Sequence, residues 1–185
     1  DVRALFCHTC GKILPCRELD PFLRLGLKPD YDLDPAELER QYIGFQRRFH
    51  PDRFATQTAR EKAYSLSHAT AVNDAYEALE SPLSRARRLL EMRGHPVHDA
   101  AETMAHPELL ASVMEMREAL AGAEGGTELA AIAAEFEASL AGCVAALATA
   151  FATGGLDSAA DLTVRLSFLE KLAGEARARA RAATA

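Results

Sequence analysis

Apolar residues recur along most of the chain at intervals of three and four, the spacing that places them on one face of a helix. The clearest case begins at Asp34, Pro35 and Glu37, which supply an N-cap, a proline at the first helical position and an acid at the third. A core-facing stripe follows at Leu38, Tyr42, Phe45 and Phe49. Because the residue before a proline is disfavoured in the helical conformation, we expect this helix to end at His50-Pro51.

A second, longer helix is predicted to run antiparallel to the first. Thr58 and Glu61 have the spacing of a capping box, and the helical pattern then continues to about Glu80. The inward face of this helix is expected to hold Leu66, Ala69, Asn73, Tyr76 and Leu79. The segment from His50 to Gln57 becomes a loop that joins the two helices into a hairpin.

Two shorter helices flank the hairpin. The apolar segment Pro21 to Leu27 predicts a brief helix that ends before the turn-forming Lys28-Pro29-Asp30. Ser81-Pro82 begins another helix, which Gly94-His95-Pro96 ends. The apolar positions of this second helix are Leu83, Ala86, Leu89 and Leu90.

The composition changes beyond residue 95, which predicts a second structural unit. Residues 95–106 form an expected linker, and residues 99–137 hold nine acids against a single base, Arg117. Glycines divide the alanine-rich remainder into three expected helices, Pro107 to about Leu120, Thr127 to about Thr153 and Asp157 to near the C-terminus. Because strand signals are nearly absent, we expect an all-α protein whose second unit is a three-helix bundle.

Composition narrows the classes of function. The 185 residues are 49% hydrophobic and 26% charged, which is typical of a folded globular chain. The longest apolar stretch, Ala138 to Phe151, falls short of the roughly 18 residues needed to cross a membrane. A net charge of −6 argues against binding nucleic acid by neutralising phosphates. We therefore expect no membrane and no nucleic acid as partner, and no catalytic constellation supports an enzyme.

The loop between the two long helices carries the most specific motif, His50-Pro51-Asp52. His95-Pro96 and His106-Pro107 also mark helix boundaries, but neither pair is followed by Asp. In its setting the motif resembles the J domain of DnaJ-type co-chaperones, over Leu19 to about Leu90. The flanking residues that carry this likeness are Tyr42, Phe45, Phe49, Asn73, Tyr76 and Leu79.

Resemblance to a J domain implies docking on a DnaK-type chaperone and stimulation of its ATPase, with no chemistry in this chain itself. In that family the loop His50-Pro51-Asp52 contacts the chaperone, while the preceding helix contributes positive charge. Arg40 and Arg47 project opposite the core stripe, with Arg48 beside them, which fits steering toward an acidic partner. The alternative is an ordinary solvated helix face, since two glutamates lie close by.

Further segments narrow the likeness to HscB, the family of J proteins dedicated to iron–sulfur cluster assembly. They cover nearly the whole chain and include Phe22-x-x-Leu25-Gly26-Leu27, Phe45 to Phe54, Asn73-x-x-Tyr76-x-x-Leu79-x-x-Pro82-x-x-Arg85-Ala86, Met116 to Leu120 and Arg165 to Leu172. This resemblance implies a J domain followed by a three-helix bundle. In the family the bundle binds the scaffold protein IscU and delivers it to the specialised chaperone HscA.

Helical geometry tests the implied scaffold-binding face without relying on the family. At about 100° per residue, Leu110 and Met114 diverge from the core stripe formed by Leu109, Val113, Met116 and Leu120. Phe168 lies about 120° from the stripe formed by Leu162, Leu166, Leu169 and Ala173. Leu110, Met114 and Phe168 match the positions at which HscB binds IscU, so we expect one exposed patch, rimmed by Glu115 and Glu118. The alternative is that the three residues border the core or pack on the J domain.

Three of the four cysteines lie in the first sixteen residues. Cys7-x-x-Cys10 has the tight spacing by which two thiolates hold zinc, but a closed structural site needs four ligands, and only Cys16 and His8 are nearby. Some HscB relatives carry two such pairs, and this pair resembles the second, so we expect the first pair upstream of Asp1. A three-cysteine site completed by His8 or by another molecule, and free thiols, are alternatives. Cys143 continues an apolar helical stripe and is expected to be a core thiol.

The predicted layout is a cysteine-containing segment (residues 1–18), a J domain (19–94), a linker (95–106) and the bundle (107–185). No cofactor is required, and a structural zinc would be incomplete in this chain. The alternatives are a J protein with a different client and a zinc-ribbon helical module, although the few basic residues near Cys7 and Cys10 argue against the latter. The alanine- and arginine-rich composition favours the bacterial cytoplasm, or the mitochondrial matrix for a eukaryotic source.

Overall fold

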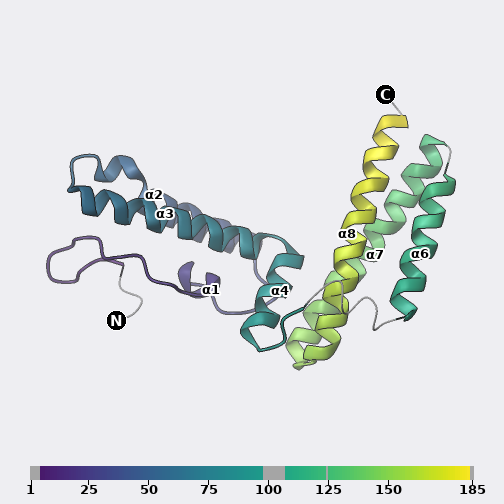
Figure 1. Cartoon of the computed structure of the whole chain (residues 1–185), viewed down its shortest axis with the longest axis horizontal. Helices are drawn as coiled ribbons and strands as arrows, with labels where there is room; N and C mark the ends of the chain where they lie inside the picture. The colour runs from purple at the N-terminus through teal and green to yellow at the C-terminus, as the bar shows by residue number, and fades with distance from the viewer. Residues whose placement is uncertain (1–4, 98–106, 124, 184–185) are drawn as a thin grey trace. The chain divides into compact units, whose positions relative to one another are not determined.

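The computed structural model describes residues 5–97, 107–123 and 125–183. Over these residues the regular secondary structure is helical, apart from one isolated β-bridge between Phe6 and Ile13 (Figure 1). The helices are α1 (Pro21–Arg24), α2 (Pro35–Phe49), the 3-10 helix η1 (Pro51–Phe54), α3 (Ala59–Glu80), α4 (Pro82–Met92), α6 (Pro107–Gly122), α7 (Gly126–Thr153) and α8 (Leu156–Ala183). The expected all-α fold is confirmed.

Contacts divide the chain into two units, residues 1–85 and 86–185. The division falls inside α4 rather than after Gly94. Within the second unit, Arg93 at the end of α4 donates from Nη1 to the carbonyl oxygen of Phe151 at 3.5 Å, and its guanidinium lies 5.3 Å from the Phe151 ring centroid. These contacts assign the end of α4 to the C-terminal unit. The expected linker at 95–106 lies mostly outside the described residues.

The helical hairpin of α2 and α3 forms the body of the N-terminal unit (Figure 1). The Asp34 carboxylate accepts the backbone N–H of Ala36 at 2.9 Å, with Pro35 at the first helical position. The predicted capping box is present, because Thr58 Oγ1 accepts from the Glu61 N–H and the Glu61 carboxylate accepts from the Thr58 N–H. Local sequence signals therefore begin both helices where we expected.

The register of α3 differs from the expected one. Leu66 is 60% exposed and Asn73 also lies on the surface. Leu79 is buried as expected, and the other residues that α3 buries are Ser65, His68, Val72 and Ala75. Two polar side chains occupy core positions because backbone carbonyls satisfy them: Ser65 Oγ donates to the Phe49 carbonyl at 2.7 Å, and His68 Nε2 to the Leu14 carbonyl at 2.9 Å.

Arg85 closes the C-terminal end of the hairpin from a buried position. Its Nε donates to the Leu79 carbonyl at 2.9 Å and its Nη1 to the Tyr31 carbonyl at 2.8 Å. A third bond joins Nη2 to the Glu80 carbonyl at 3.3 Å. One guanidinium thus satisfies carbonyls that the end of α3 would otherwise leave unpaired.

The first helix, α1, is shorter than expected, because the chain turns at Gly26, whose φ is +68°.

The C-terminal unit contains the expected three-helix bundle of α6, α7 and α8 (Figure 1). One cluster of its buried core consists of Val113, Leu120, Ala123, Leu129, Ala133, Phe136, Leu172, Ala173 and Ala176. Arg179 of α8 caps α6 by donating to the carbonyls of Leu120 at 2.6 Å and Ala123 at 3.1 Å. Cys143 is buried as expected, and burial raises the pKa of its thiol.

Helix α7 is long and apolar enough, by length and composition alone, to cross a membrane. No stretch of this kind was expected from the sequence. The difference arises because many of its positions are alanine, including exposed ones such as Ala130, Ala134 and Ala141, which raise the mean hydropathy without adding bulk. The larger apolar side chains of α7, Leu129, Phe136 and Leu147, are buried in the C-terminal unit. A core helix of a bundle has the same composition.

We predict that acid destabilises the N-terminal unit through His68. Burial lowers the pKa of its imidazole, with a smaller lowering contribution from the Arg24 charge, although the bond to the Leu14 carbonyl opposes the shift. The unfolded chain therefore takes up the proton first, and the free energy of unfolding falls as the pH drops through and below about 6.5.

Urea unfolding followed by tyrosine fluorescence would measure this effect, since all four tyrosines lie in the N-terminal unit. His68→Gln keeps a hydrogen-bond donor but cannot titrate. Its loss of stability between about pH 7.5 and about pH 5.5 should be smaller than that of the wild type. Equal losses in the two proteins would contradict this role of His68.

Candidate functional site

The predicted loop motif is exposed to solvent at the tip of the hairpin. His50 is the N-cap of η1, and its Nδ1 accepts the backbone N–H of Asp52 at 3.3 Å. Pro51 occupies the first position of η1, where its missing N–H costs nothing. The Asp52 side chain is 91% exposed, with one carboxylate oxygen 3.5 Å from His50 Nδ1. The motif therefore has a defined local shape and presents all three side chains outward.

A buried residue fixes the base of this loop. Phe49, directly before His50, is 1% exposed, and its ring stacks on His68 with centroids 4.5 Å apart. The Phe49 carbonyl accepts the Ser65 hydroxyl from α3. Both the side chain and the backbone of the last residue of α2 are thus attached to α3. A partner that contacts His50-Pro51-Asp52 meets a loop that is already positioned.

Polar and aromatic contacts hold the middle of the hairpin together. Tyr42 of α2 stacks on Tyr76 of α3 with ring centroids 4.2 Å apart, and its hydroxyl donates to Asn73 Oδ1 at 3.1 Å. Gln46 Nε2 donates to the same Asn73 oxygen. Asn73 therefore joins the two helices from their exposed edge rather than from the core. This explains why polar Asn73 occurs among the mostly aromatic residues that flank the His50-Pro51-Asp52 loop.

The three predicted arginines of α2 are all exposed. Arg40 Nη2 lies 4.0 Å from the Asp34 carboxylate, in an exposed ion pair of the kind that contributes little to stability. The Arg48 guanidinium lies 5.0 Å from the ring centroid of Phe6 in the cysteine-containing segment. Arg47, directly before Arg48 in the sequence, is exposed to solvent. The structure therefore exposes all three arginines on the helix that leads into the loop, together with Glu37 and Glu39.

The first cysteine pair lies in a short hairpin of residues 5–14, here named the cysteine hairpin. The Cys7 N–H donates to the Lys12 carbonyl and the Gly11 N–H to the Cys7 carbonyl, both at 2.8 Å, and Gly11 has a φ of +69°. Backbone N–H groups of Cys10 and Thr9 that bond to the Cys7 sulfur lower the pKa of this thiol. This environment favours the thiolate, which is the form that binds metal.

The residues present supply only part of a zinc site. Cys16 Sγ accepts from Arg24 Nη1 at 3.5 Å. Within the described residues, no group of three or more His, Cys, Asp or Glu side chains is placed to hold a metal ion. Cys7 and Cys10 fit half of a tetrahedral site, and neither Cys16 nor His8 completes it.

On the bundle, the predicted scaffold-binding residues have unequal environments. Leu110 and Met114 of α6 are 44% and 54% exposed, and Glu115 and Glu118 beside them are exposed. We name these four residues the client surface, after the scaffold binding that is proposed for them below. Phe168 of α8 differs, because it is half-buried against the bundle core, with Lys171 Nζ 5.6 Å from its ring centroid. Phe168 therefore borders the core, which the sequence had offered as the alternative to full exposure.

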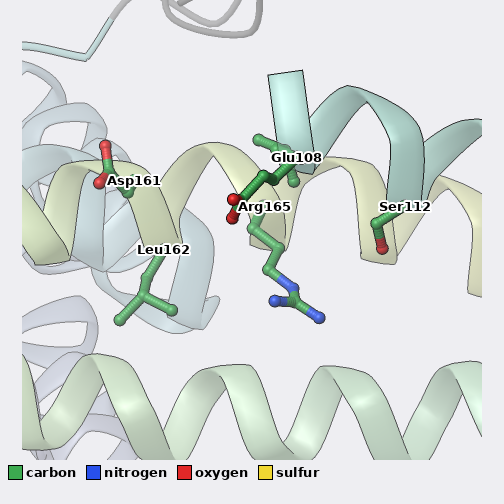
Figure 2. A pocket seen from close by; sticks show the side chains of 6 residues that line it. Glu108, Ser112, Asp161, Leu162 and Arg165 are labelled. Carbon is green, nitrogen blue, oxygen red and sulfur yellow. The ribbon is translucent and has the colours of Figure 1, made fainter. Parts of the chain in front are cut away.

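A second surface of the bundle was not expected from the sequence. A cleft of about 400 Å³ is lined by Glu108, Leu109, Ser112, Asp161, Leu162 and Arg165. Figure 2 shows that Leu162 and Arg165 extend to one side of α8, whereas Asp161 extends to the other. At about 100° per residue, Glu108 and Ser112 lie on the flank of α6 away from Leu110 and Met114. The cleft is thus separate from the client surface, and its side chains of both charge signs favour no single ligand.

The sequence also failed to indicate the surroundings of the loop. Phe6 stacks on Phe49 with centroids 5.8 Å apart, and it lines a cavity together with Arg48, Arg53 and Phe54. A usable signal was present, because an aromatic residue directly precedes the first cysteine and needs a packing partner. Its partner could not be found from spacing, since more than forty residues separate Phe6 from Phe49.

Comparison with known proteins agrees with this geometry. A model of the HSCB C-terminal oligomerisation domain matches residues 105–177. An Arabidopsis thaliana protein described as an iron-sulfur cluster co-chaperone protein HscB homolog is 31% identical over 172 residues, which cover 92% of this chain and 68% of that protein. The co-chaperone protein HscB homolog of Vibrio vulnificus strain YJ016 is 33% identical over 161 residues, covering 85% of this chain and 94% of the relative.

The structural comparison extends over both units. The crystal structure of human co-chaperone protein HscB matches with a TM-score of 0.88 and 26% identity, over 95% of this chain and 89% of the human chain. The N-terminal hairpin with its exposed loop is therefore a J domain, followed by the C-terminal bundle of the same architecture. The chain belongs to the HscB family of co-chaperones, which act in iron–sulfur cluster biogenesis.

Proposed function

We propose that the J domain docks on a DnaK-type chaperone of the HscA kind and stimulates its ATP hydrolysis. The observation that carries this proposal is the exposed loop His50-Pro51-Asp52, held rigidly by Phe49 and preceded by exposed arginines. The chain contributes binding energy and geometry, and the chaperone performs the hydrolysis. A preformed loop avoids the entropy cost of ordering upon binding, so that more of the contact energy appears as affinity.

The charge of the α2 surface supports an acidic partner. Arg40, Arg47 and Arg48 project from the helix that leads into the loop, and each is exposed. Such charges raise the rate of encounter with a surface of opposite sign more than they lower the rate of dissociation. The arginines therefore steer the chaperone toward the loop, and His50-Pro51-Asp52 makes the specific contact.

The bundle is proposed to bind an IscU-type scaffold through the client surface. Leu110 and Met114 are large apolar side chains that the bundle leaves exposed one turn apart, with Glu115 and Glu118 beside them. An apolar centre with a polar rim is the usual anatomy of a specific interface. Phe168 would contribute only its exposed edge. In one chain, chaperone docking and scaffold binding together would deliver the scaffold to the ATPase.

Cys7 and Cys10 are proposed to hold a structural zinc together with two ligands from outside the described residues. The support is the lowered pKa of the Cys7 thiol and the tight turn that places Cys7 and Cys10 in one short hairpin. The metal would stabilise this hairpin and take no part in ATP hydrolysis.

Replacing the loop histidine should separate docking from folding. We expect His50→Gln to reduce stimulation of the chaperone ATPase by about tenfold or more. The glutamine amide can still accept the Asp52 N–H, so the helical content measured by circular dichroism should not change. Scaffold binding, measured by calorimetry, should also persist. Stimulation at the wild-type level by this variant would rule out the loop as the docking element.

The client surface is tested by Leu110→Ala combined with Met114→Ala. Apolar anchors at interfaces commonly contribute about 1–3 kcal/mol each, so scaffold affinity should fall by roughly tenfold or more. Both side chains are largely exposed, and the free energy of unfolding should change by less than about 0.5 kcal/mol. Leu66→Ala is the control, because Leu66 is a leucine of the other unit that is at least as exposed as Leu110 and Met114.

The effect of replacing Phe168 is measured separately from that of Leu110 and Met114, since the half-buried Phe168 ring packs on the bundle core. Phe168→Ala should lower the free energy of unfolding by about 1–3 kcal/mol as well as weakening the scaffold complex. Unchanged scaffold affinity in the Leu110/Met114 double variant would move the client surface elsewhere on the bundle.

Zinc content can be measured directly on this chain produced together with any residues that precede Asp1 in the full protein. Elemental analysis should find about one zinc per chain, and Cys7→Ser with Cys10→Ser should remove it. Cys143→Ser is the control, because that thiol is buried in the bundle and should leave the zinc content unchanged. Absence of zinc from the extended chain would contradict the metal proposal.

A further inference from the structure

A cationic pocket lies beside the exposed loop, within the N-terminal unit. Its lining consists of Phe6 from the cysteine hairpin, Arg48 from the last turn of α2, and Arg53 and Phe54 from η1. The cavity measures about 340 Å³, which is room for one acidic side chain together with water. These four residues are named the anion pocket below. Three separate segments of the chain build it, so its shape depends on the folded J domain and on the hairpin packed against it.

We propose that the anion pocket receives a carboxylate side chain of the DnaK-type chaperone, and that the cysteine hairpin is thereby part of the docking surface. This inference rests on the proposed function and names a second contact of the same interaction. The chain supplies the cations and the aromatic walls, and the chaperone supplies the anion. The pocket would act beside the loop rather than in its place.

The charge of the lining selects the ligand. Arg48 and Arg53 are the two charged residues of the pocket, and no acidic side chain lines it in the part of the chain that the structure describes. A guanidinium presents a planar fork of donors that matches a carboxylate in a bidentate geometry. Asp52, next to Arg53 in the sequence, is directed toward His50, with 3.5 Å between its carboxylate and Nδ1. The pocket cations therefore remain available to an outside anion.

Phe6 gives the pocket an aromatic wall against which the Arg48 guanidinium lies. Its ring lies 5.0 Å from the Arg48 guanidinium and stacks on buried Phe49, so it holds Arg48 against an apolar wall. An ion pair formed against two aromatic side chains is less hydrated than one in open solvent, and its attraction is correspondingly stronger. Phe6 acts as a positioning residue, while the guanidinium groups bind the carboxylate.

Continuity with the loop identifies the chaperone as the source of the anion. Arg53 and Phe54 follow Asp52 directly in η1, so a partner in contact with His50-Pro51-Asp52 comes within one helical turn of the pocket. The cysteine hairpin is fixed to the same unit at a second point, where the Leu14 carbonyl accepts from His68 Nε2. Phe6 is thus held in place before the partner arrives.

The test compares single variants of the pocket with a matched arginine. Arg53→Gln removes one cation from an exposed position and leaves the fold intact, and Phe6→Ala removes the aromatic wall. Each should weaken binding of the DnaK-type chaperone by about five- to tenfold, as measured by biolayer interferometry in ATP. The combined variant should lose less than the product of the two, since both act on one pocket. Arg60→Gln, which changes an exposed arginine outside the lining, should bind within about twofold of the wild type.

Charge reversal identifies the partner group. Arg53→Glu should bind more weakly than Arg53→Gln, and one Asp→Lys or Glu→Lys variant in a panel covering the chaperone surface should restore its affinity. Rescue of that kind would establish the contact. Failure of every panel member to restore binding would overturn the assignment of a chaperone carboxylate to the pocket.

The outcomes also separate this inference from the proposed function. If Arg53→Gln and Phe6→Ala both bind like the wild type while His50→Gln loses stimulation, the anion pocket is not part of the interface and the docking function stands. If the wild-type chain neither binds nor stimulates the chaperone, the docking function and the pocket assignment are both overturned.

Discussion

Phe49 is held from three directions at once. Its ring is stacked on His68 at 4.5 Å and on Phe6 at 5.8 Å, and its carbonyl accepts the hydroxyl of Ser65. Full burial of such a side chain contributes about 2–3 kcal/mol, and aromatic stacking adds to it. Since His50 is the next residue, this packing decides where the exposed loop begins. The cysteine hairpin, α2 and α3 all meet at this one ring, so the geometry of the loop depends on all three.

The amphipathic pattern predicted α2 correctly because its buried residues are apolar and its start carries local capping signals. It misplaced the buried face of α3 because Ser65 and His68 are polar by composition and buried by position. A pattern of apolar and polar residues counts such side chains as exposed. Their burial requires carbonyl groups from Phe49 and Leu14, which become available only when the hairpin and the N-terminal segment have folded. These contacts between distant residues cannot be inferred from spacing.

Contacts between distant residues also explain why the predictions for α6 and α8 of the bundle had different outcomes. Helical geometry placed Leu110 and Met114 off the core stripe of α6, and the structure exposes both. It placed Phe168 off the stripe of α8 by the same reasoning, yet that ring packs on the core. The angle around one helix sets which side a residue faces, whereas burial also depends on where the neighbouring helices cross. The alanine-rich helix α7 packs against α8, and how closely two helices pack is a property of the pair.

The cysteine hairpin exposes its turn to solvent, while residues on its two arms pack against the J domain. Cys7 and Cys10 lie in a turn whose own hydrogen bonds are local, whereas Phe6 and Leu14 on its two arms contact Phe49 and His68. A disturbance of the cysteine turn can therefore reach the base of the loop through Phe6 and through Leu14. Because Arg48 rests on Phe6, the first of these contacts also positions one of the cations beside the loop. The hairpin that carries the cysteines therefore helps to shape the surface around the exposed loop, and its packing constrains the position of Arg48 and of the base of the loop.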